Sequence, residues 1–323
     1  MCGIVGVVGN SNAVDILIQG LEKLEYRGYD SAGIYVTDAP DKGCLVKSVG
    51  RIADLRAKIS SDVKGSTGIG HTRWATHGQA TEDNAHPHTS ETGRFVLVHN
   101  GVIENYLQIK EEYLQGHKFK GQTDTEIAVH LIGKFVDEDG LSVLEALKKS
   151  LHIIQGSYAF ALVDSQAPDT IYVAKNKSPL LIGVGEGYNM VCSDAMAMIR
   201  ETSQFMEIHD KELVVLTKDA ITVTDYEGNA IERGTYTAEL DLSDIGKGTY
   251  PYYMLKEIDE QPTVMRKLIS TYADDEGNIT VDPAIVKSVQ EADRIYILAA
   301  GTSYNAGFAS KAMFEKLTDT PVE

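Results

Sequence analysis

Cysteine and tryptophan are scarce in this 323-residue chain, which has three cysteines and one tryptophan. A small and odd number of cysteines argues against a disulfide framework and fits a reducing cytoplasm. The cysteines and histidines show no spacing typical of a zinc site. We therefore expect neither a metal nor a cofactor.

The chain also lacks a net basic charge and long apolar runs. The formal net charge is -17, which disfavours a nucleic-acid partner because such proteins usually carry a basic patch. No run approaches the ~18 consecutive apolar residues of a membrane helix, and the N-terminus lacks the basic segment of a signal peptide. These absences predict a cytoplasmic protein with neither a nucleic acid nor a membrane as partner.

Hydrophobic periodicity predicts strands at both ends of the first 240 residues and helices between them. This order favours an α+β layered domain, without internal repeats, that ends near residue 240. Thr123 and Glu126 have the spacing of a helix capping box. The predicted strands are 2–8, 30–37, 44–49, 67–72, 95–99, 157–164, 170–174, 180–184, 190–193, 212–217 and 221–226, and the predicted helices are 12–25, 52–59, 104–114, 123–135 and 141–154.

The residues from 239 onwards are organised differently. Residues 239–249 are acidic and glycine-containing and predict a linker, and helices are predicted over 253–272 and 283–292. An apolar strand over 294–300 then turns through Gly301, Thr302 and Ser303 into a helix over 304–317. A lone strand–helix pair cannot bury both faces of a parallel strand, so these residues predict the beginning of a second, truncated domain.

Cys2 follows the initiator methionine, and a small residue at position 2 generally allows Met1 to be removed. The mature chain would then begin with a thiol beside a free α-amine. The amine has a reference pKa of about 7.7–8.0 and can accept the thiol proton, so no separate histidine is needed. The alternative is that Cys2 is only a small apolar residue at the start of a buried strand.

Two further groups of residues suit acyl transfer from an amino-acid substrate. Asn100 and Gly101 follow the strand 95–99 and could donate hydrogen bonds to an oxyanion, although Asn-Gly is also a common turn. Arg73 can hold a carboxylate bidentately, with Trp74, Thr76 and His77 beside it. Asp124 could hold an ammonium group, or simply complement a helix dipole; for Trp74 the alternative is core packing.

The motifs together resemble those of the class II glutamine amidotransferases. Each motif is weak alone, but six in order are specific. Their forms favour the branch that acts on fructose 6-phosphate over the amidophosphoribosyltransferases and asparagine synthetases. The motifs are CGIVG (2–6), EYRGYDSAG (25–33), HTRWATHG (71–78), NAHPH (84–88), HNG (99–101) and TDTE (123–126).

The resemblance implies a four-layer αββα domain of the N-terminal-nucleophile type over residues 1–240. It implies that L-glutamine is the substrate and that the site residues have defined roles. Cys2 would be nucleophile and, through its amine, base; Asn100 and Gly101 the oxyanion hole; Arg73 and Asp124 the carboxylate and ammonium ligands. Thr76 and His77 would line the site, Trp74 would help gate ammonia, and Arg27 would support the site.

For the remainder, the resemblance implies linker and helices over 241–292 and the start of a sugar isomerase (SIS) domain over 293–323. Thr302 and Ser303 resemble part of a sugar-phosphate loop, with helix N-capping as the alternative. Members of this branch are longer and act on fructose 6-phosphate, as homodimers. We therefore expect only glutamine hydrolysis from this chain. The alternatives are another class II amidotransferase, or an inactive glutamine-binding domain if Met1 is retained.

Overall fold

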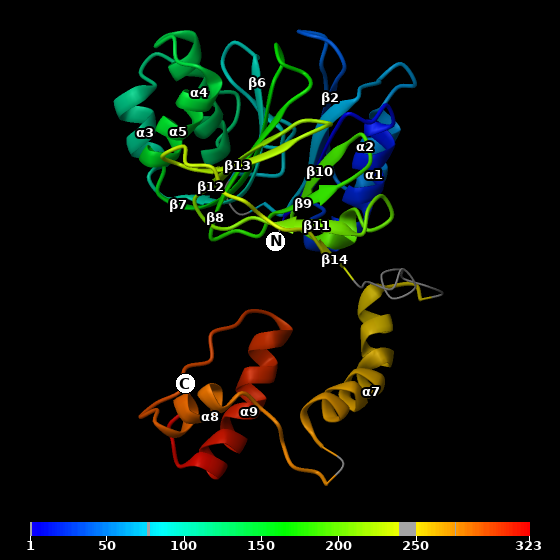
Figure 1. Ribbon diagram of the computed structural model, residues 1–323, viewed down its shortest axis with the longest axis vertical. Coiled ribbons are helices and arrows are strands. Elements are labelled where there is room, and N and C mark those ends of the chain that lie inside the picture. The colour runs from blue at the N-terminus through cyan, green and yellow to red at the C-terminus, as the bar shows by residue number, and fades with distance from the viewer. Residues whose placement is uncertain (1, 76–77, 239–249, 275) are drawn as a thin grey trace. The chain divides into compact units, whose positions relative to one another are not determined.

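The computed structural model describes residues 2–75, 78–238, 250–274 and 276–323. The chain divides into two compact units, residues 1–246 and 247–323. The described part of the first unit consists of two β-sheets stacked face to face, with helices on the outer face of each (Figure 1). The predicted four-layer αββα arrangement is therefore confirmed.

The first sheet has the strand order β14-β11-β9-β10-β1-β4-β2-β3. Helices α1 (Ala13–Leu24) and α2 (Ile52–Lys58) pack on its outer face. Its strands are β1 (Gly3–Val8), β2 (Ser31–Thr37), β3 (Cys44–Val49), β4 (Thr67–Arg73), β9 (Leu181–Val184), β10 (Asn189–Cys192), β11 (Gln204–Glu207) and β14 (Tyr236–Thr237).

The second sheet has the order β13-β12-β8-β7-β6-β5. Helices α3 (Tyr106–Tyr113), α4 (Asp124–Asp137) and α5 (Val143–Ile153) cover its outer face. Its strands are β5 (His88–Thr89), β6 (Phe95–Ile103), β7 (Gly156–Asp164), β8 (Ile171–Asn176), β12 (Glu212–Leu216) and β13 (Ile221–Asp225).

Strand β1 shows why the layers form. Alternate side chains of a strand point to opposite faces, and all six residues of β1 are buried. Ile4 and Val8 lie in the core between the sheets, whereas Val5 and Val7 lie in the core beneath α1 and α2. Burial of each such side chain contributes about 1.5–3 kcal/mol. A strand that is apolar at every position is stable only between two layers. This requirement fixes β1 in the interior of its sheet and places Cys2 immediately before the strand.

Differences from the prediction are few and have local causes. Strands β5, β11 and β14, which have two to four residues each, were not predicted. Strand β6 does not end at His99: it continues to Ile103, with Asn100 and Gly101 in register with β7. The predicted end of this strand at His99 is therefore wrong, and so is the alternative of a plain Asn-Gly turn.

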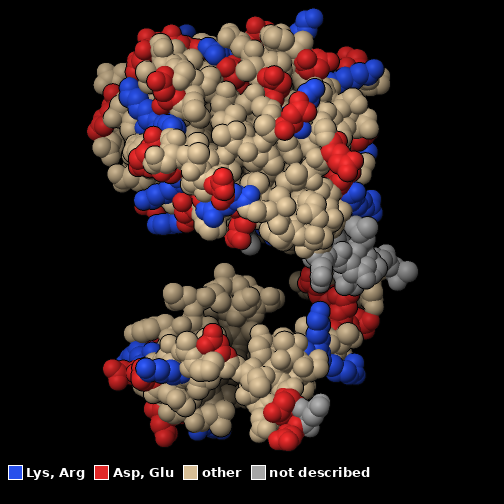
Figure 2. Space-filling view, viewed as in Figure 1, with Lys and Arg blue, Asp and Glu red and all other residues tan. Residues whose placement is uncertain are grey.

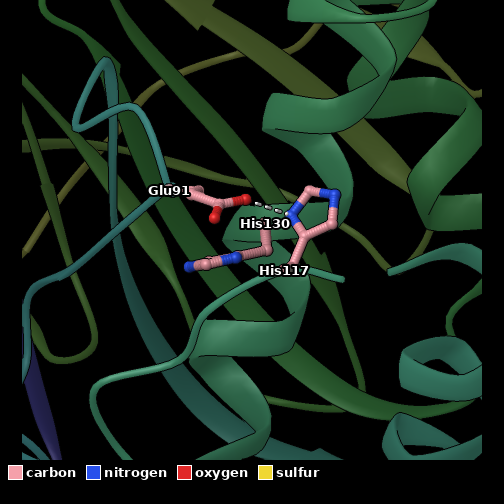
Figure 3. Close-up of side chains that lie close together, drawn as sticks. All are labelled: Glu91, His117 and His130. Atoms are coloured by element: carbon pink, nitrogen blue, oxygen red, sulfur yellow. Dashed lines mark ion pairs between the residues drawn. The ribbon is translucent and has the colours of Figure 1, made fainter. Parts of the chain in front are cut away.

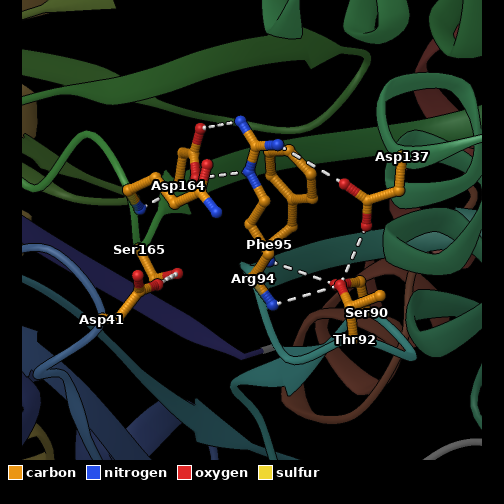
Figure 4. A network of polar contacts seen from close by, with 9 residues as sticks. Asp41, Ser90, Thr92, Arg94, Phe95, Asp137, Asp164 and Ser165 are labelled. Carbon is orange, nitrogen blue, oxygen red and sulfur yellow. Dashed lines mark hydrogen bonds and ion pairs between the residues drawn. The ribbon is translucent and has the colours of Figure 1, made fainter. Parts of the chain in front are cut away.

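A polar network joins the two sheets at one edge (Figure 4). Arg94 donates two hydrogen bonds to Asp164, at 2.9 and 2.8 Å, and lies 3.4 Å from an oxygen of Asp137. Ser165 then donates to Asp41, in the connection between β2 and β3, at 3.1 Å. The side chain of Asp164 is only 3% exposed, so its charge depends on the guanidinium of Arg94.

The second unit contains helices α7 (Tyr253–Tyr272), α8 (Pro283–Gln290) and α9 (Thr302–Thr318). The predicted strand over 294–300 does not form; one isolated bridge joins Ile295 to Val322. A strand needs a ladder partner for its backbone, and among the described residues of this unit residues 321–323 supply only three backbone hydrogen bonds, to Ile295 and Ile297. Of the predicted strand–helix pair, only the helix forms.

Apolar side chains are widely exposed in this second unit. Leu298 is 93% exposed and Leu317 80%, and only Lys256 and Val322 are buried among the described residues of 250–323. Exposed apolar surface of this extent is typical of an interaction surface. No helix in the described ranges is long and apolar enough to cross a membrane. On the visible face of the first unit, basic and acidic side chains are interspersed (Figure 2).

Candidate active site

Three separate segments meet at Cys2. The residue precedes β1, and Trp74, just after β4, donates its backbone N–H to the sulfur at 3.3 Å. From the second sheet, the Nδ2 of Asn100 on β6 donates to the backbone carbonyl of Cys2 at 3.1 Å. The candidate nucleophile therefore lies where the ends of the two sheets face each other.

A pocket opens at this point and gathers most of the predicted site. Cys2, Arg73, Trp74, Gly101 and Asp124 all line it, with Asn100 attached through its hydrogen bond to Cys2. Thr76 and His77 lie outside the described residues. The remaining lining residues, which sequence reasoning did not assign to the site, are His86, His99, Thr123 and Thr125.

The thiol of Cys2 is held in its protonated form. Burial raises its pKa, an effect that the N–H of Trp74 only partly opposes by donating to the sulfur. Only the thiolate is a good nucleophile. A base close to the sulfur is therefore required, and the α-amine of a mature N-terminal cysteine would meet this requirement. Met1 lies outside the described residues.

His71 fixes the orientation of Asn100. Its Nε2 lies 2.9 Å from Oδ1 of Asn100 and 3.1 Å from the carbonyl oxygen of His99. Both partners are acceptors, so Nε2 carries the proton. Burial lowers the pKa of His71 to about 3, which keeps the ring neutral. With its oxygen held in this way, the amide of Asn100 turns its NH2 group towards Cys2.

Gly101 cannot be replaced by a larger residue without distortion. Its φ is 134°, and an added Cβ would lie 2.1 Å from the carbonyl oxygen of Ser157 on β7. Positive φ of this size is rarely adopted by other residues. Glycine at this position lets β6 pass close to its neighbour at the wall of the pocket.

Opposite charges line the pocket beside Cys2. Arg73, at the end of β4, is buried and donates to the backbone carbonyl of Gln79 at 3.2 Å. Asp124 begins α4 and accepts from the N–H of Ile103 at 2.8 Å. Its neighbour Thr123 caps the helix by accepting from the N–H of Glu126 at 3.3 Å. This arrangement suits the two charged ends of an amino acid.

The predicted capping box forms only in part. Glu126 does not reach back to the N–H of Thr123; its carboxylate accepts from the N–H groups of Lys120 and Gly121, both at 2.8 Å. It thereby orders the chain just before α4.

Trp74 lines the pocket, whereas Arg27 lies in the turn that follows α1. Trp74 is 44% exposed and packs edge-to-face on Tyr29 with ring centroids 5.4 Å apart. Core packing, the alternative for this residue, is therefore wrong. Arg27 forms an ion pair with Asp194, whose side chain in turn accepts from the N–H of Met196. Arg27 does not line the pocket.

Thr302 and Ser303 are the first residues of α9, in the second unit. Gly301 occupies the cap position with φ 61°, and no side chain caps this helix. Helix capping by Thr302 or Ser303, the alternative to a phosphate loop, is therefore wrong. Both side chains are exposed.

A cysteine at position 2, an αββα fold and a pocket with both charges are together typical of one class of protein, the glutamine amidotransferases that use an N-terminal nucleophile. Residues 71–201 match the family model described as a glutamine amidotransferase domain. Over these residues the chain is similar to the glutamine amidotransferases.

Individual relatives indicate which amidotransferase the chain resembles. The chain is 84% identical over all 323 residues to glutamine–fructose-6-phosphate aminotransferase [isomerizing] of Streptococcus mutans, and covers 53% of that protein. The protein of the same name from Streptococcus pyogenes serotype M1 is 83% identical with the same coverage. The chain thus spans about half the length of the curated relatives it matches.

Solved structures show the same fold. Glutamine phosphoribosylpyrophosphate amidotransferase from B. subtilis matches with a TM-score of 0.61 and 29% identity, over 71% of this chain and 50% of that one. A structure titled as the allosteric regulatory enzyme of purine biosynthesis matches with a TM-score of 0.62 and 29% identity, over 70% and 49%.

Proposed function

We propose that this chain hydrolyses L-glutamine to glutamate and ammonia, with Cys2 as the nucleophile. The observation that carries the proposal is the position of Cys2 in one pocket with Arg73 and Asp124. Arg73 would bind the α-carboxylate and Asp124 the α-ammonium group of glutamine. The side-chain amide of the substrate is then directed towards the sulfur.

The α-amine of mature Cys2 accepts the thiol proton, and the thiolate attacks the amide carbon. The resulting oxyanion accepts hydrogen bonds from Nδ2 of Asn100 and the N–H of Gly101. Collapse breaks the C–N bond, and the ammonium of Cys2 gives its proton to the leaving ammonia. A water, deprotonated by the same amine, attacks the thioester; the C–S bond breaks, glutamate is released, and the ammonium returns its proton to the thiolate of Cys2. Thr76 and His77 complete the wall of the pocket, and Trp74 borders the exit of ammonia.

A glutaminase assay on protein with verified removal of Met1 tests this mechanism. Cys2→Ala should abolish ammonia release, whereas Cys44→Ala, on β3, should not. The electrophilic glutamine analogue 6-diazo-5-oxo-norleucine should label Cys2 alone. Turnover by Cys2→Ala, or labelling at Cys44 or Cys192, would refute the assignment. Protein that retains Met1 should bind glutamine without hydrolysing it, and N-terminal mass measurement distinguishes the two forms.

For the whole protein we propose transfer of the ammonia to fructose 6-phosphate, giving glucosamine 6-phosphate. The 84% identity to an aminotransferase of that name supports this acceptor over the phosphoribosyl acceptor of the structural relative. Residues 293–323 would begin the SIS domain, and Thr302 and Ser303 would contribute to its sugar-phosphate site. The test is formation of glucosamine 6-phosphate by the product of the complete reading frame, and its absence would refute this acceptor.

We also propose that the whole protein is a cytoplasmic homodimer that binds neither nucleic acid nor membrane. The three free cysteines support a reducing compartment, and the exposed apolar side chains of α7 to α9 support contact with further protein. Cell fractionation and light scattering of the full-length protein test these two statements. Recovery in the membrane fraction, or a monomeric mass, would contradict them.

A further inference from the structure

Glu91, His117 and His130 converge on a small pocket away from Cys2 (Figure 3). They come from three segments: the connection between β5 and β6, the connection between α3 and α4, and α4 itself. One ligand atom from each residue lies within 4.8 Å of the other two. None of the three lines the glutamine pocket.

His130 has a buried nitrogen without a partner. The residue is 2% exposed, and its Nδ1 has no hydrogen-bond partner in the described part of the chain. Its other nitrogen, Nε2, lies 4.0 Å from a carboxylate oxygen of Glu126. A carboxylate behind one nitrogen favours protonation there and leaves the other nitrogen as an acceptor, which is the arrangement of metal-bound histidines.

His117 lies between two carboxylates. Its Nδ1 is 2.9 Å from Oε2 of Glu91, and its Nε2 is 3.2 Å from Oε1 of Glu138. The same geometry would suit a protonated imidazole held by two ion pairs. That alternative leaves the buried Nδ1 of His130 unexplained, whereas a cation shared by Glu91, His117 and His130 accounts for both histidines.

We propose that Glu91, His117 and His130 form a zinc site with one coordination position left for water. Two imidazoles and one carboxylate are ligands that Zn²⁺ accepts, whereas Mg²⁺ and Ca²⁺ prefer oxygen ligands. Tetrahedral bonds of about 2.0–2.2 Å separate ligand atoms by roughly 3.3 Å. The most distant ligand atoms must therefore approach by up to about 1.5 Å, and Glu91, with a side chain 41% exposed, is free to make this movement.

Nearby charge is compatible with a cation. Lys134 lines the same pocket, but its ammonium is 2.8 Å from Asp139 and 3.6 Å from Glu138. Glu91 and Glu138 add negative charge on the open side. A bound cation would fasten two loops to α4, whose first residue is Asp124 of the glutamine pocket. His130 lies six residues along that helix, about 9 Å from its start.

Isothermal titration calorimetry of the full chain with ZnCl2, after removal of metal by a chelator, tests the site. The Cys2→Ala background prevents competition by that thiol. We expect one equivalent of zinc, no heat with MgCl2, and at least a tenfold weaker affinity in Glu91→Gln and in His117→Gln. His152→Gln, an exposed histidine on α5, is the matched control and should bind as the parent does.

Co²⁺ as a spectroscopic probe distinguishes the ligand set, because tetrahedral coordination gives an intense visible absorption that His117→Gln should weaken. Circular dichroism checks that each variant is folded, and Glu91, in an exposed connection, is the variant least expected to unfold. The proposal is overturned if zinc binds the parent and both variants equally. It is also overturned if the folded parent binds no zinc, which would assign His117 to its ion pairs with Glu91 and Glu138 alone.

Discussion

Replacing Asn100 by alanine should slow glutamine hydrolysis without preventing binding of the substrate. Asn100 presents its Nδ2 to the carbonyl of Cys2 at 3.1 Å, and His71 prevents the amide from turning over. Alanine removes this donor from the proposed position of the oxyanion. Arg73 and Asp124, the proposed substrate ligands, are left in place.

The size of the effect follows from this geometry. Loss of one donor to an oxyanion typically lowers kcat by about 10²–10³, or about 3–4 kcal/mol of barrier. The cost in stability should be smaller, about 1 kcal/mol, because the Nε2–H of His71 keeps its second acceptor, the carbonyl of His99. We therefore expect a large fall in kcat, with a change in KM below about threefold.

Steady-state measurement of glutamate release over a range of glutamine concentrations gives both constants. Asn105→Ala is the matched control, because Asn105 lies just after β6 and uses both ends of its amide, with Ile153 and Gln155 at 2.9 Å. It should lose stability and retain kcat. If Asn100→Ala keeps kcat within threefold of the parent, Asn100 does not stabilise the oxyanion.

Three other perturbations test charge and burial. Arg73→Lys should raise KM at least tenfold, with a smaller effect on kcat, because an ammonium cannot bind a carboxylate bidentately; an unchanged KM in the same assay would contradict this. Arg94→Ala should lower the free energy of unfolding by about 3–5 kcal/mol, since it leaves the buried carboxylate of Asp164 unpaired; urea unfolding that shows a loss below about 1 kcal/mol would contradict it. Burial lowers the pKa of His71 to about 3 and that of His86 well below 6.5, so the unfolded chain takes up protons first as the pH falls. The free energy of unfolding should therefore be constant above about pH 7 and should fall by roughly 2 kcal/mol for each histidine between pH 6.5 and 5; urea unfolding at those two pH values measures this, and equal stability at both would refute it.

Local patterns in the sequence predicted most elements of the first unit. The apolar run of β1 and the helical spacing of α1 appear in the structure within one or two residues of the predicted bounds. Such patterns are local because each records which faces of one element are buried. The strand over 294–300 was wrong for a related reason: an apolar run indicates burial, but a strand also requires a neighbour for its backbone.

Motifs also predicted which residues lie at the proposed glutamine pocket, but not which contacts hold them there. Cys2, Arg73 and Asp124 were predicted from their chemistry and from resemblance, and the structure brings them to one pocket. The support that His71 gives to Asn100 was missed, although His71 begins one of the six motifs. A buried hydrogen bond between two sheets cannot be predicted from the spacing of residues along the chain.

The sequence by itself determined the class of elements, the acidic character and the presence of a cysteine at the start of a buried strand. Tertiary structure alone decided that Asn100, 98 positions away, reaches the carbonyl of Cys2, and that Glu91, His117 and His130 meet although no metal-binding spacing joins them. The reason is physical. Periodicity encodes which face of an element is buried, whereas the contacts between elements depend on how sheets and helices stack, and stacking brings together residues whose separation in the chain carries no information about their distance.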